Sequence, residues 1–175
     1  MPRLLIPIES AAAETRVAAS PETLKKFITL GCSVAVERGA GVSSGFLDET
    51  YASAGADLVA PGEAQAWGQA DVLLCVQSPS PASLGRLRRG ALVVGMLSPY
   101  GNHDLAEALK GCGLSAMALE LLPRISRAQS ADVLSSQANI AGYKAVLLGA
   151  AALDRYFPML MTAAGTVQPA RVVVL

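Results

Sequence analysis

Short apolar runs alternate with amphipathic segments over roughly the first 120 residues of the chain. The runs that predict strands are Leu4–Ile8, Val34–Val36, Leu58–Val59, Val72–Val76, Ala91–Met96 and Leu114–Leu119. The segments that predict helices run from Pro21, behind a capping Ser20, to Gly31 and lie near Asp48–Ala54, Glu63–Gln69 and Asn102–Lys110. Strands that alternate with helices are typical of a parallel sheet covered on both faces. The pattern therefore predicts an open α/β domain.

From Ser130 onward the pattern changes to a single long helical repeat. The residues three or four apart that form its stripe are Leu134, Ala138, Ala141, Ala145, Leu148 and Ala152. A stripe of alanines lets another backbone approach closely, as expected for a helix between two units. The helix is predicted to run to about Phe157, before Pro158, and a turn-rich connection then leads to a buried strand at Arg171–Leu175. The expected parts are a domain at 1–127, a linker helix at 128–160, and a connection with a strand at 161–175.

Composition limits the possible functions. The 175 residues are 52% hydrophobic and 16% charged, which suits one well-buried core. Fourteen basic and fourteen acidic residues give no net charge, so binding to nucleic acid or anionic lipid is not expected. Three scattered cysteines predict reduced thiols in a cytosolic protein, and a single histidine predicts no metal site. No apolar run is long enough to cross a membrane, so a soluble chain is expected.

The common nucleotide and hydrolase motifs do not occur in this sequence. It has neither a phosphate-binding Gly-x-x-x-x-Gly-Lys-Ser/Thr loop nor a Gly-x-Gly-x-x-Gly loop after a strand, and Gly39-Ala-Gly41 is best explained as a plain turn. It also has no Gly-x-Ser-x-Gly elbow. A catalytic triad could use only His103, which follows the helix-capping Asn102 and is expected in an exposed first turn.

The polar cluster with the most chemical promise lies between the sheet and the long helix. Asp132 and Ser135 are three apart on one face of the predicted helix, Gln129 lies just before them, and Arg124 is on the incoming loop. A nicotinamide carboxamide carries an NH2 donor and a carbonyl acceptor, so an orienting site needs an acceptor such as Asp132 and donors such as Ser135 or Arg124. The alternative is helix capping by Ser130 and Asp132 beside solvated arginines, and spacing alone favours this alternative.

Several blocks of the sequence, spread over the whole chain, resemble the alpha subunit of proton-translocating NAD(P) transhydrogenase. The blocks are Glu14–Ala18, Gly39–Gly41 with Gly45, Phe46 and Asp48, Tyr51 with Ala54–Ala56, Pro123–Gln129, Leu134–Tyr143, Phe157–Met159, Thr162–Thr166 and Pro169–Val172. The Arg-Ala-Gln and Ser-Ser-Gln-Ala-Asn blocks are specific to that family, whereas Glu14–Ala18 is shared with the related alanine dehydrogenases. The resemblance implies a Rossmann-like, flavodoxin-like parallel sheet followed by a linker helix.

The resemblance also implies an activity and partners. NADH held by the alpha subunit would transfer hydride to NADP+ on a partner subunit, coupled to proton flow through a membrane component. The residues close to the nicotinamide would be Arg124, Gln129, Asp132 and Ser135. The resemblance further implies a homodimer and peripheral attachment to the inner membrane through partner subunits. In the family, the strand that matches Arg171–Leu175 leads into the glycine loop, so this chain alone is expected to be inactive.

Two other functions stay open. Alanine dehydrogenase has a 2-oxo acid site that resembles Arg16 but also needs a lysine and a histidine, which protonate the alkoxide formed from a ketone. Gln77 and Ser98 stand at those positions here, and Arg16 is then expected to form a structural ion pair. The third possibility is a non-enzymatic module completed by another chain that carries the glycine loop.

Overall fold

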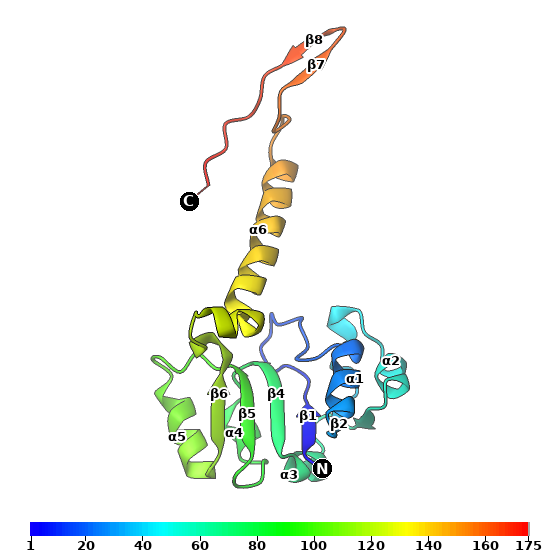
Figure 1. The fold of residues 1–175 in the computed structure, drawn as a ribbon, viewed down its shortest axis with the longest axis vertical. Helices are drawn as coiled ribbons and strands as arrows, with labels where there is room; N and C mark the ends of the chain where they lie inside the picture. The colour runs from blue at the N-terminus through cyan, green and yellow to red at the C-terminus, as the bar shows by residue number, and fades with distance from the viewer. Residues whose placement is uncertain (175) are drawn as a thin grey trace. The chain divides into compact units, whose positions relative to one another are not determined.

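The computed structural model describes residues 1–174 and divides into two compact units, of which the first spans Met1–Ile125 and the second begins at Ser126. The first unit holds a six-stranded, entirely parallel sheet in the order β3-β2-β1-β4-β5-β6 (Figure 1). Its strands are β1 (Arg3–Ile6), β2 (Ser33–Glu37), β3 (Asp57–Val59), β4 (Val72–Gln77), β5 (Leu92–Met96) and β6 (Ser115–Ala118). The predicted parallel sheet is confirmed, because every predicted strand of this unit forms.

Five α-helices connect the strands. They are α1 (Pro21–Thr29), α2 (Asp48–Ser53), α3 (Ala64–Gln69), α4 (Pro81–Leu84) and α5 (His103–Cys112). The predicted Ser20 cap is present, since its side chain accepts a hydrogen bond from the Thr23 amide at 3.2 Å. Helix α4 was not predicted, because four residues are too short to show a helical repeat. Its start nevertheless has the same Ser-Pro signal as α1, with Ser80 as the cap and Pro81 in the first turn.

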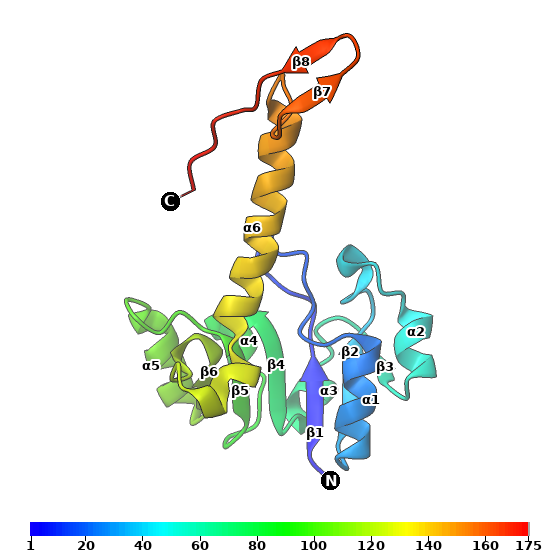
Figure 2. The ribbon, with the colours of Figure 1, turned by 45° about the horizontal axis from the view of Figure 1, so that its top comes forward.

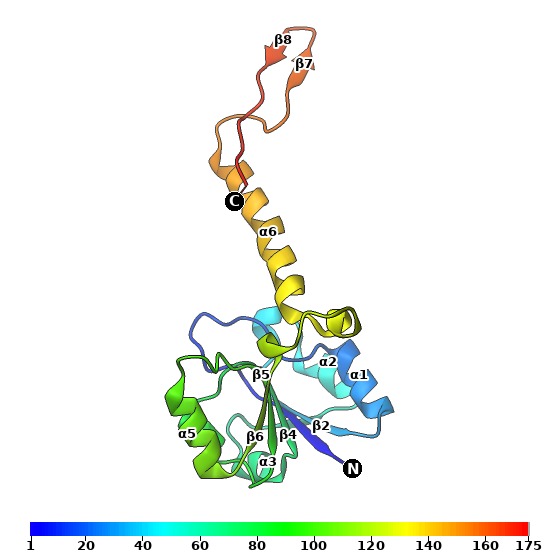
Figure 3. The ribbon, with the colours of Figure 1, turned by 60° about the vertical axis from the view of Figure 1, so that its left-hand side comes forward.

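The sheet, which has helices on either side of it (Figure 3), separates two hydrophobic cores. One core packs Leu24 of α1 and Tyr51 of α2 on Ile6. The other packs Trp67 of α3 and helices α4 and α5 on Leu73. Helices thus cover both faces, as predicted. Coverage is uneven, however, because the face shared with α1 and α2 is half-buried on β4 and β5 and exposed on β6, where Met117 is 49% exposed.

The second unit holds one long helix, α6 (Val133–Ala152), and the hairpin formed by β7 (Leu160–Thr162) and β8 (Gly165–Val167) (Figure 2). The helix is shorter than predicted at both ends. Residues Ser126–Ala131 form a 3-10 helix, η3, and the chain is already extended at Leu153. The even spread of Ala and Leu around α6 leaves few polar positions to mark where the helical repeat ends.

The chain after α6 also differs from the prediction. The antiparallel hairpin occupies part of what was predicted to be a turn-rich connection. Residues 171–174 adopt no regular secondary structure, whereas a strand was predicted there, and its last residue, Leu175, lies outside the described residues. A strand forms only when a neighbouring strand supplies hydrogen bonds. Among the described residues no strand is paired with 171–174, and just before this segment the Ala170 amide donates to the carbonyl oxygens of Tyr156 and Phe157, at 3.2 and 3.1 Å.

Candidate functional site

Three of the four predicted site residues lie in one local structure at the start of α6. Gln129 is exposed in η3, Asp132 is the N-cap of α6, and Ser135 lies in its first turn. The Asp132 amide donates to the Gln129 carbonyl oxygen at 3.3 Å, which ties η3 to the helix start. Arg124 is exposed at the end of the first unit, so the structure does not group it with the other three.

Asp132 and Ser135 form a compact acceptor and donor pair. The Ser135 amide donates to Asp132 Oδ1 at 2.9 Å, and the Ser135 hydroxyl donates to Oδ2 at 2.6 Å. Helix capping, the alternative considered for this residue, is therefore present. A carboxylate oxygen accepts hydrogen bonds, and a hydroxyl group can both donate and accept, so the pair brings acceptor and donor chemistry together at one place.

A second polar cluster lies at the carboxyl ends of β1 and β4. The chain runs from β1 towards β3 in one direction and from β4 towards β6 in the other, so this edge is the switch point at which open α/β sheets bind ligands. Glu9 accepts the amide hydrogens of Val76 and Gln77 there, at 2.6 and 3.0 Å. Burial raises the pKa of Glu9, and these two bonds partly offset that effect.

The predicted ion pair of Arg16 belongs to the same cluster. Its guanidinium donates to both oxygens of Glu14, at 2.7 and 2.6 Å, and this bond lowers the pKa of Glu14 to about 2. The Gln77 carboxamide also donates to Glu14, at 2.9 Å. A polar cavity of about 230 Å³ lies beside the pair. The sequence analysis linked Arg16 and Gln77 only through the resemblance to alanine dehydrogenase, and it did not include Glu9, which lies 68 positions from Gln77.

Glu37 is a buried charged residue that the sequence analysis did not single out. It is 3% exposed and accepts three hydrogen bonds, from the Ile8 amide, the Gly62 amide and the Trp67 indole, at 2.9, 2.7 and 2.8 Å. It therefore ties the chain after β1 to the loop after β3 and to α3. The signal in the sequence is an acidic residue directly at the end of the apolar run of β2.

The remaining candidates have local structural explanations. Gly39 opens a plain turn, as predicted, in which its amide donates to Asp48 at 2.8 Å. Asn102 caps α5 through the Leu105 amide at 3.2 Å, so His103 is a first-turn residue. Burial raises the pKa of the Cys75 thiol to about 12, which makes it a poor nucleophile. Among the described residues, no three His, Cys, Asp or Glu side chains are grouped to hold a metal.

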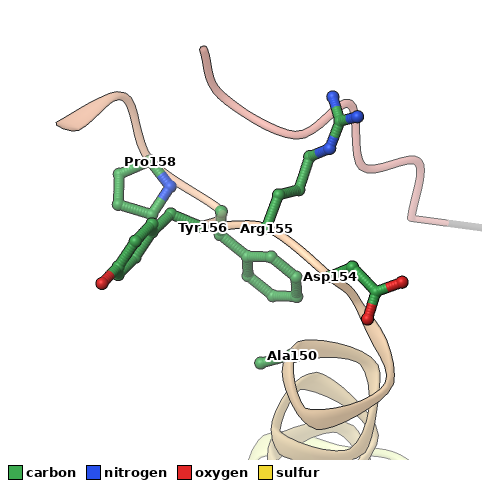
Figure 4. A pocket seen from close by; sticks show the side chains of 6 residues that line it. Ala150, Asp154, Arg155, Tyr156 and Pro158 are labelled. Atoms are coloured by element: carbon green, nitrogen blue, oxygen red, sulfur yellow. The ribbon is translucent and has the colours of Figure 1, made fainter. Parts of the chain in front are cut away.

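An apolar hollow of about 520 Å³ lies at the end of α6 (Figure 4). Ala150 forms part of its wall, and Tyr156 and Pro158 lie on the opposite side. Asp154 and Arg155 point away from one another, so no polar groups converge in the hollow.

In the part of the chain that the structure describes, no helix, including α6, is long and apolar enough to cross a membrane.

The strand order and the polar switch point define the first unit as a Rossmann-like α/β domain. Known proteins narrow this class. The family described as alanine dehydrogenase/PNT, N-terminal domain, matches residues 5–141. The chain belongs to this family. The resemblance to the transhydrogenase alpha subunit and to the related alanine dehydrogenases is therefore confirmed.

Three relatives show where the chain lies within the family. An NAD(P) transhydrogenase alpha-subunit chain of Rhodospirillum rubrum is 49% identical over 98% of this chain and 46% of its own length. The crystal structure of a transhydrogenase from Sinorhizobium meliloti superposes with a TM-score of 0.89 at 48% identity, over 96% of this chain and 50% of that one. The alanine dehydrogenase of Bacillus subtilis is 34% identical over 86% of this chain and 38% of its own length. The chain thus spans about half the length of these transhydrogenase relatives.

Proposed function

We propose that the chain is the N-terminal portion of the NAD(H)-binding alpha subunit of a proton-translocating NAD(P) transhydrogenase. In the assembled enzyme, NADH supplies a hydride that passes to NADP+ on a partner subunit. The similarity to transhydrogenase subunits over 98% of the chain carries this proposal. It is supported by the Asp132 and Ser135 pair, whose acceptor and donor groups suit a carboxamide.

The role of these residues is to orient the nicotinamide. Asp132 accepts a hydrogen bond from the carboxamide NH2, and Ser135, held at 2.6 Å from Asp132, fixes the direction of that carboxylate. Arg124 donates to the carboxamide oxygen, and Gln129 reaches towards the nucleotide on the partner subunit. Hydride transfer needs the two rings in close and aligned contact, so small errors in orientation slow the reaction.

The pyrophosphate of NADH needs a glycine loop and a helix N-terminus, which this sequence does not contain. In our proposal residues 171–175 lead into the portion of the subunit that supplies them. We therefore expect this 175-residue chain to bind NADH weakly or not at all in titration calorimetry. A dissociation constant in the low micromolar range for the chain alone would contradict this division of the binding site.

Alanine dehydrogenase activity is the second candidate, favoured by the cavity beside Arg16. Two strand ends argue against it. At the end of β4, Gln77 donates its carboxamide to Glu14, and after β5 stands Ser98. Neither side chain titrates near neutral pH, so neither replaces the lysine and histidine that protonate an alkoxide. Transfer between two nicotinamide rings needs no such proton.

The test uses a completed subunit, in which the remaining portion of the Rhodospirillum rubrum relative is joined after residue 175 and the NADP-binding partner is added. We expect hydride transfer from NADH to NADP+ and no reduction of pyruvate. The double change Gln77→Lys and Ser98→His should leave transfer largely intact. Pyruvate reduction by the unchanged protein would favour alanine dehydrogenase. Correct assembly without either reaction would favour the non-enzymatic module.

We also propose that the completed subunit is a homodimer that reaches the membrane through its partner subunits. The second unit supports the dimer, because among its described residues none is buried, although Tyr143, Met161 and Val173 are 69%, 71% and 82% exposed. Apolar surface of this extent is unfavourable in water and is normally covered. Sedimentation equilibrium of the completed subunit should give twice the mass of a single completed subunit. A monomeric mass at micromolar concentration would exclude the dimer.

A further inference from the structure

Ser98, directly after β5, has an unusual backbone. Its φ is 48°, and among the described residues it is the only non-glycine with a positive φ. Residues other than glycine rarely adopt a positive φ, because their side chains clash with the backbone there. Pro99 follows, and a residue before proline is normally pushed towards extended conformations. The surrounding structure must therefore hold Ser98 in place.

Glu120 provides that hold. It lies in the 3-10 helix η2 (Leu119–Leu121), directly after β6, and its Oε1 accepts a hydrogen bond from the Ser98 amide. Its other oxygen, Oε2, is buried and has no hydrogen-bond partner within the described residues. A strained residue is thus bonded to a carboxylate that is itself incompletely satisfied. Backbone strain of this kind is concentrated at active sites and ligand-binding segments.

The segment that Glu120 anchors carries Arg124. After η2 the Leu122 amide donates to the Leu119 carbonyl oxygen at 3.2 Å, and the Ile125 amide donates to that of Pro123 at 2.9 Å. Tight local turns therefore separate Glu120 from Arg124, and all these residues belong to the first unit. The path of the chain up to Arg124 is set by where η2 is fixed on the end of β5.

We propose that Glu120 is a positioning residue for hydride transfer, which acts by fixing η2 to Ser98 and so setting the direction in which Arg124 reaches the nicotinamide. This inference rests on the proposed function. The feature of Glu120 that matters is a hydrogen-bond acceptor at the right reach. Its negative charge is not required, because the group it binds is a neutral amide.

Three variants of the completed subunit, with its NADP-binding partner, separate reach from charge. Glu120→Gln keeps an acceptor oxygen at the same reach, and its kcat should stay within about two-fold of the parent. Glu120→Asp keeps the charge but is one methylene too short, and Glu120→Ala has no acceptor. Both should lower kcat about five-fold or more while KM for NADH changes less than two-fold, since only orientation is lost.

The matched control is Glu63→Ala. Glu63 also accepts a hydrogen bond from a backbone amide, that of Ala60, at 3.1 Å. It follows β3 at the opposite edge of the sheet, so the kcat of the Glu63→Ala variant should stay within two-fold of the parent. Parental kcat in Glu120→Asp, or equal losses in Glu120→Gln and Glu120→Asp, would overturn the inference. If the parent transfers hydride and Arg124→Ala is slow, only the role of Glu120 has failed. A parent without transfer contradicts the proposed function itself.

Discussion

The two units of this chain are built on opposite principles. In the first unit, two buried cores enclose a parallel sheet, and residues such as Leu5 and Leu73 are fully inaccessible to water. In the second unit, α6 and the β7–β8 hairpin satisfy their backbone hydrogen bonds, but none of their described residues is buried. A lone two-stranded hairpin is at best marginally stable in water. The first unit is therefore stabilised by its own buried cores. The second unit has no such core among its described residues, so we expect its stability to depend on further contacts.

The largest expected difference between the units is the effect of truncating a leucine. Leu5→Ala in β1 should destabilise the chain by about 2–5 kcal/mol, because it leaves a cavity in the core. Leu148→Ala in α6, where the side chain is 58% exposed, should change stability by less than about 0.5 kcal/mol. Urea unfolding of the isolated chain measures both. Equal losses would show that the two units share one core.

Adding a methyl group should have opposite effects in the two units. A Cβ at Gly95 of β5 would lie 2.5 Å from the Cys75 carbonyl oxygen, so Gly95→Ala should destabilise by about 1–3 kcal/mol or more. Gly142 of α6 has open space around it, and Gly142→Ala should stabilise the helix by up to about 1 kcal/mol. Thermal unfolding followed by circular dichroism distinguishes the two signs. A loss of stability in Gly142→Ala would mean that α6 is already covered.

A smaller effect separates the two roles of Asp132. Asp132→Ala removes the cap of α6 and should cost about 1 kcal/mol of helix stability, seen as lost ellipticity at the helix band. Asp132→Asn should retain the helix, because asparagine caps as well as aspartate. Any functional loss in Asp132→Asn then reports on the carboxylate itself, that is, on its charge and its second acceptor oxygen, and not on the helix. If the two variants lost equal helicity, the cap would depend on charge and the separation would fail.

The smallest expected effect is the pH dependence of the Glu14 ion pair in the first unit. The pKa of Glu14 is lowered from 4.5 to about 2, so its contribution to stability is complete above about pH 4.5 and is lost as the pH falls towards 2. Arg16 is 39% exposed, so solvent screening limits this contribution to about 1 kcal/mol or less. Glu9, whose pKa is raised, acts in the opposite sense.

The variant Glu14→Gln isolates this contribution, because it leaves Glu9 in place. The difference in unfolding free energy between parent and variant should be present at pH 7 and shrink at pH 3 in urea titrations. A difference that stays constant with pH would show that the Arg16 bond does not perturb Glu14.

The first unit was more predictable than the second for a physical reason. Buried strands such as β4 appear in the sequence as continuous apolar runs, and the start of α1 is marked by the capping Ser20 and by Pro21 in the first turn. In α6 apolar residues occur on all sides, so the sequence pattern did not show that the helix ends at Ala152. The segment Thr162–Pro169 was recognised as turn-rich, but the three-residue strands β7 and β8 have too little alternation to be seen.

The candidate site was predictable only where its members are close in sequence. The three-residue spacing of Asp132 and Ser135 predicted their proximity, and the hydrogen bonds confirm it. The cluster of Glu9 with Gln77 and the bond of Glu120 to Ser98 join different strand ends, so only the fold brings them together. The left-handed backbone of Ser98 has no sequence signature, because serine before proline predicts an extended residue.

The central claim is that Arg124 and Asp132 orient a nicotinamide held mainly by another portion of the subunit. The direct measurement is the rate of hydride transfer and the affinity for NADH in the completed subunit with its NADP-binding partner. Arg124→Ala and Asp132→Asn should each slow transfer about ten-fold or more, or about 1.4 kcal/mol of barrier, while NADH affinity changes much less. The matched changes Arg89→Ala, in the turn before β5, and Asp104→Asn, in the first turn of α5, should alter neither quantity. Transfer at the parental rate in both site variants would contradict the claim and leave Asp132 as a helix cap and Arg124 as a solvated side chain.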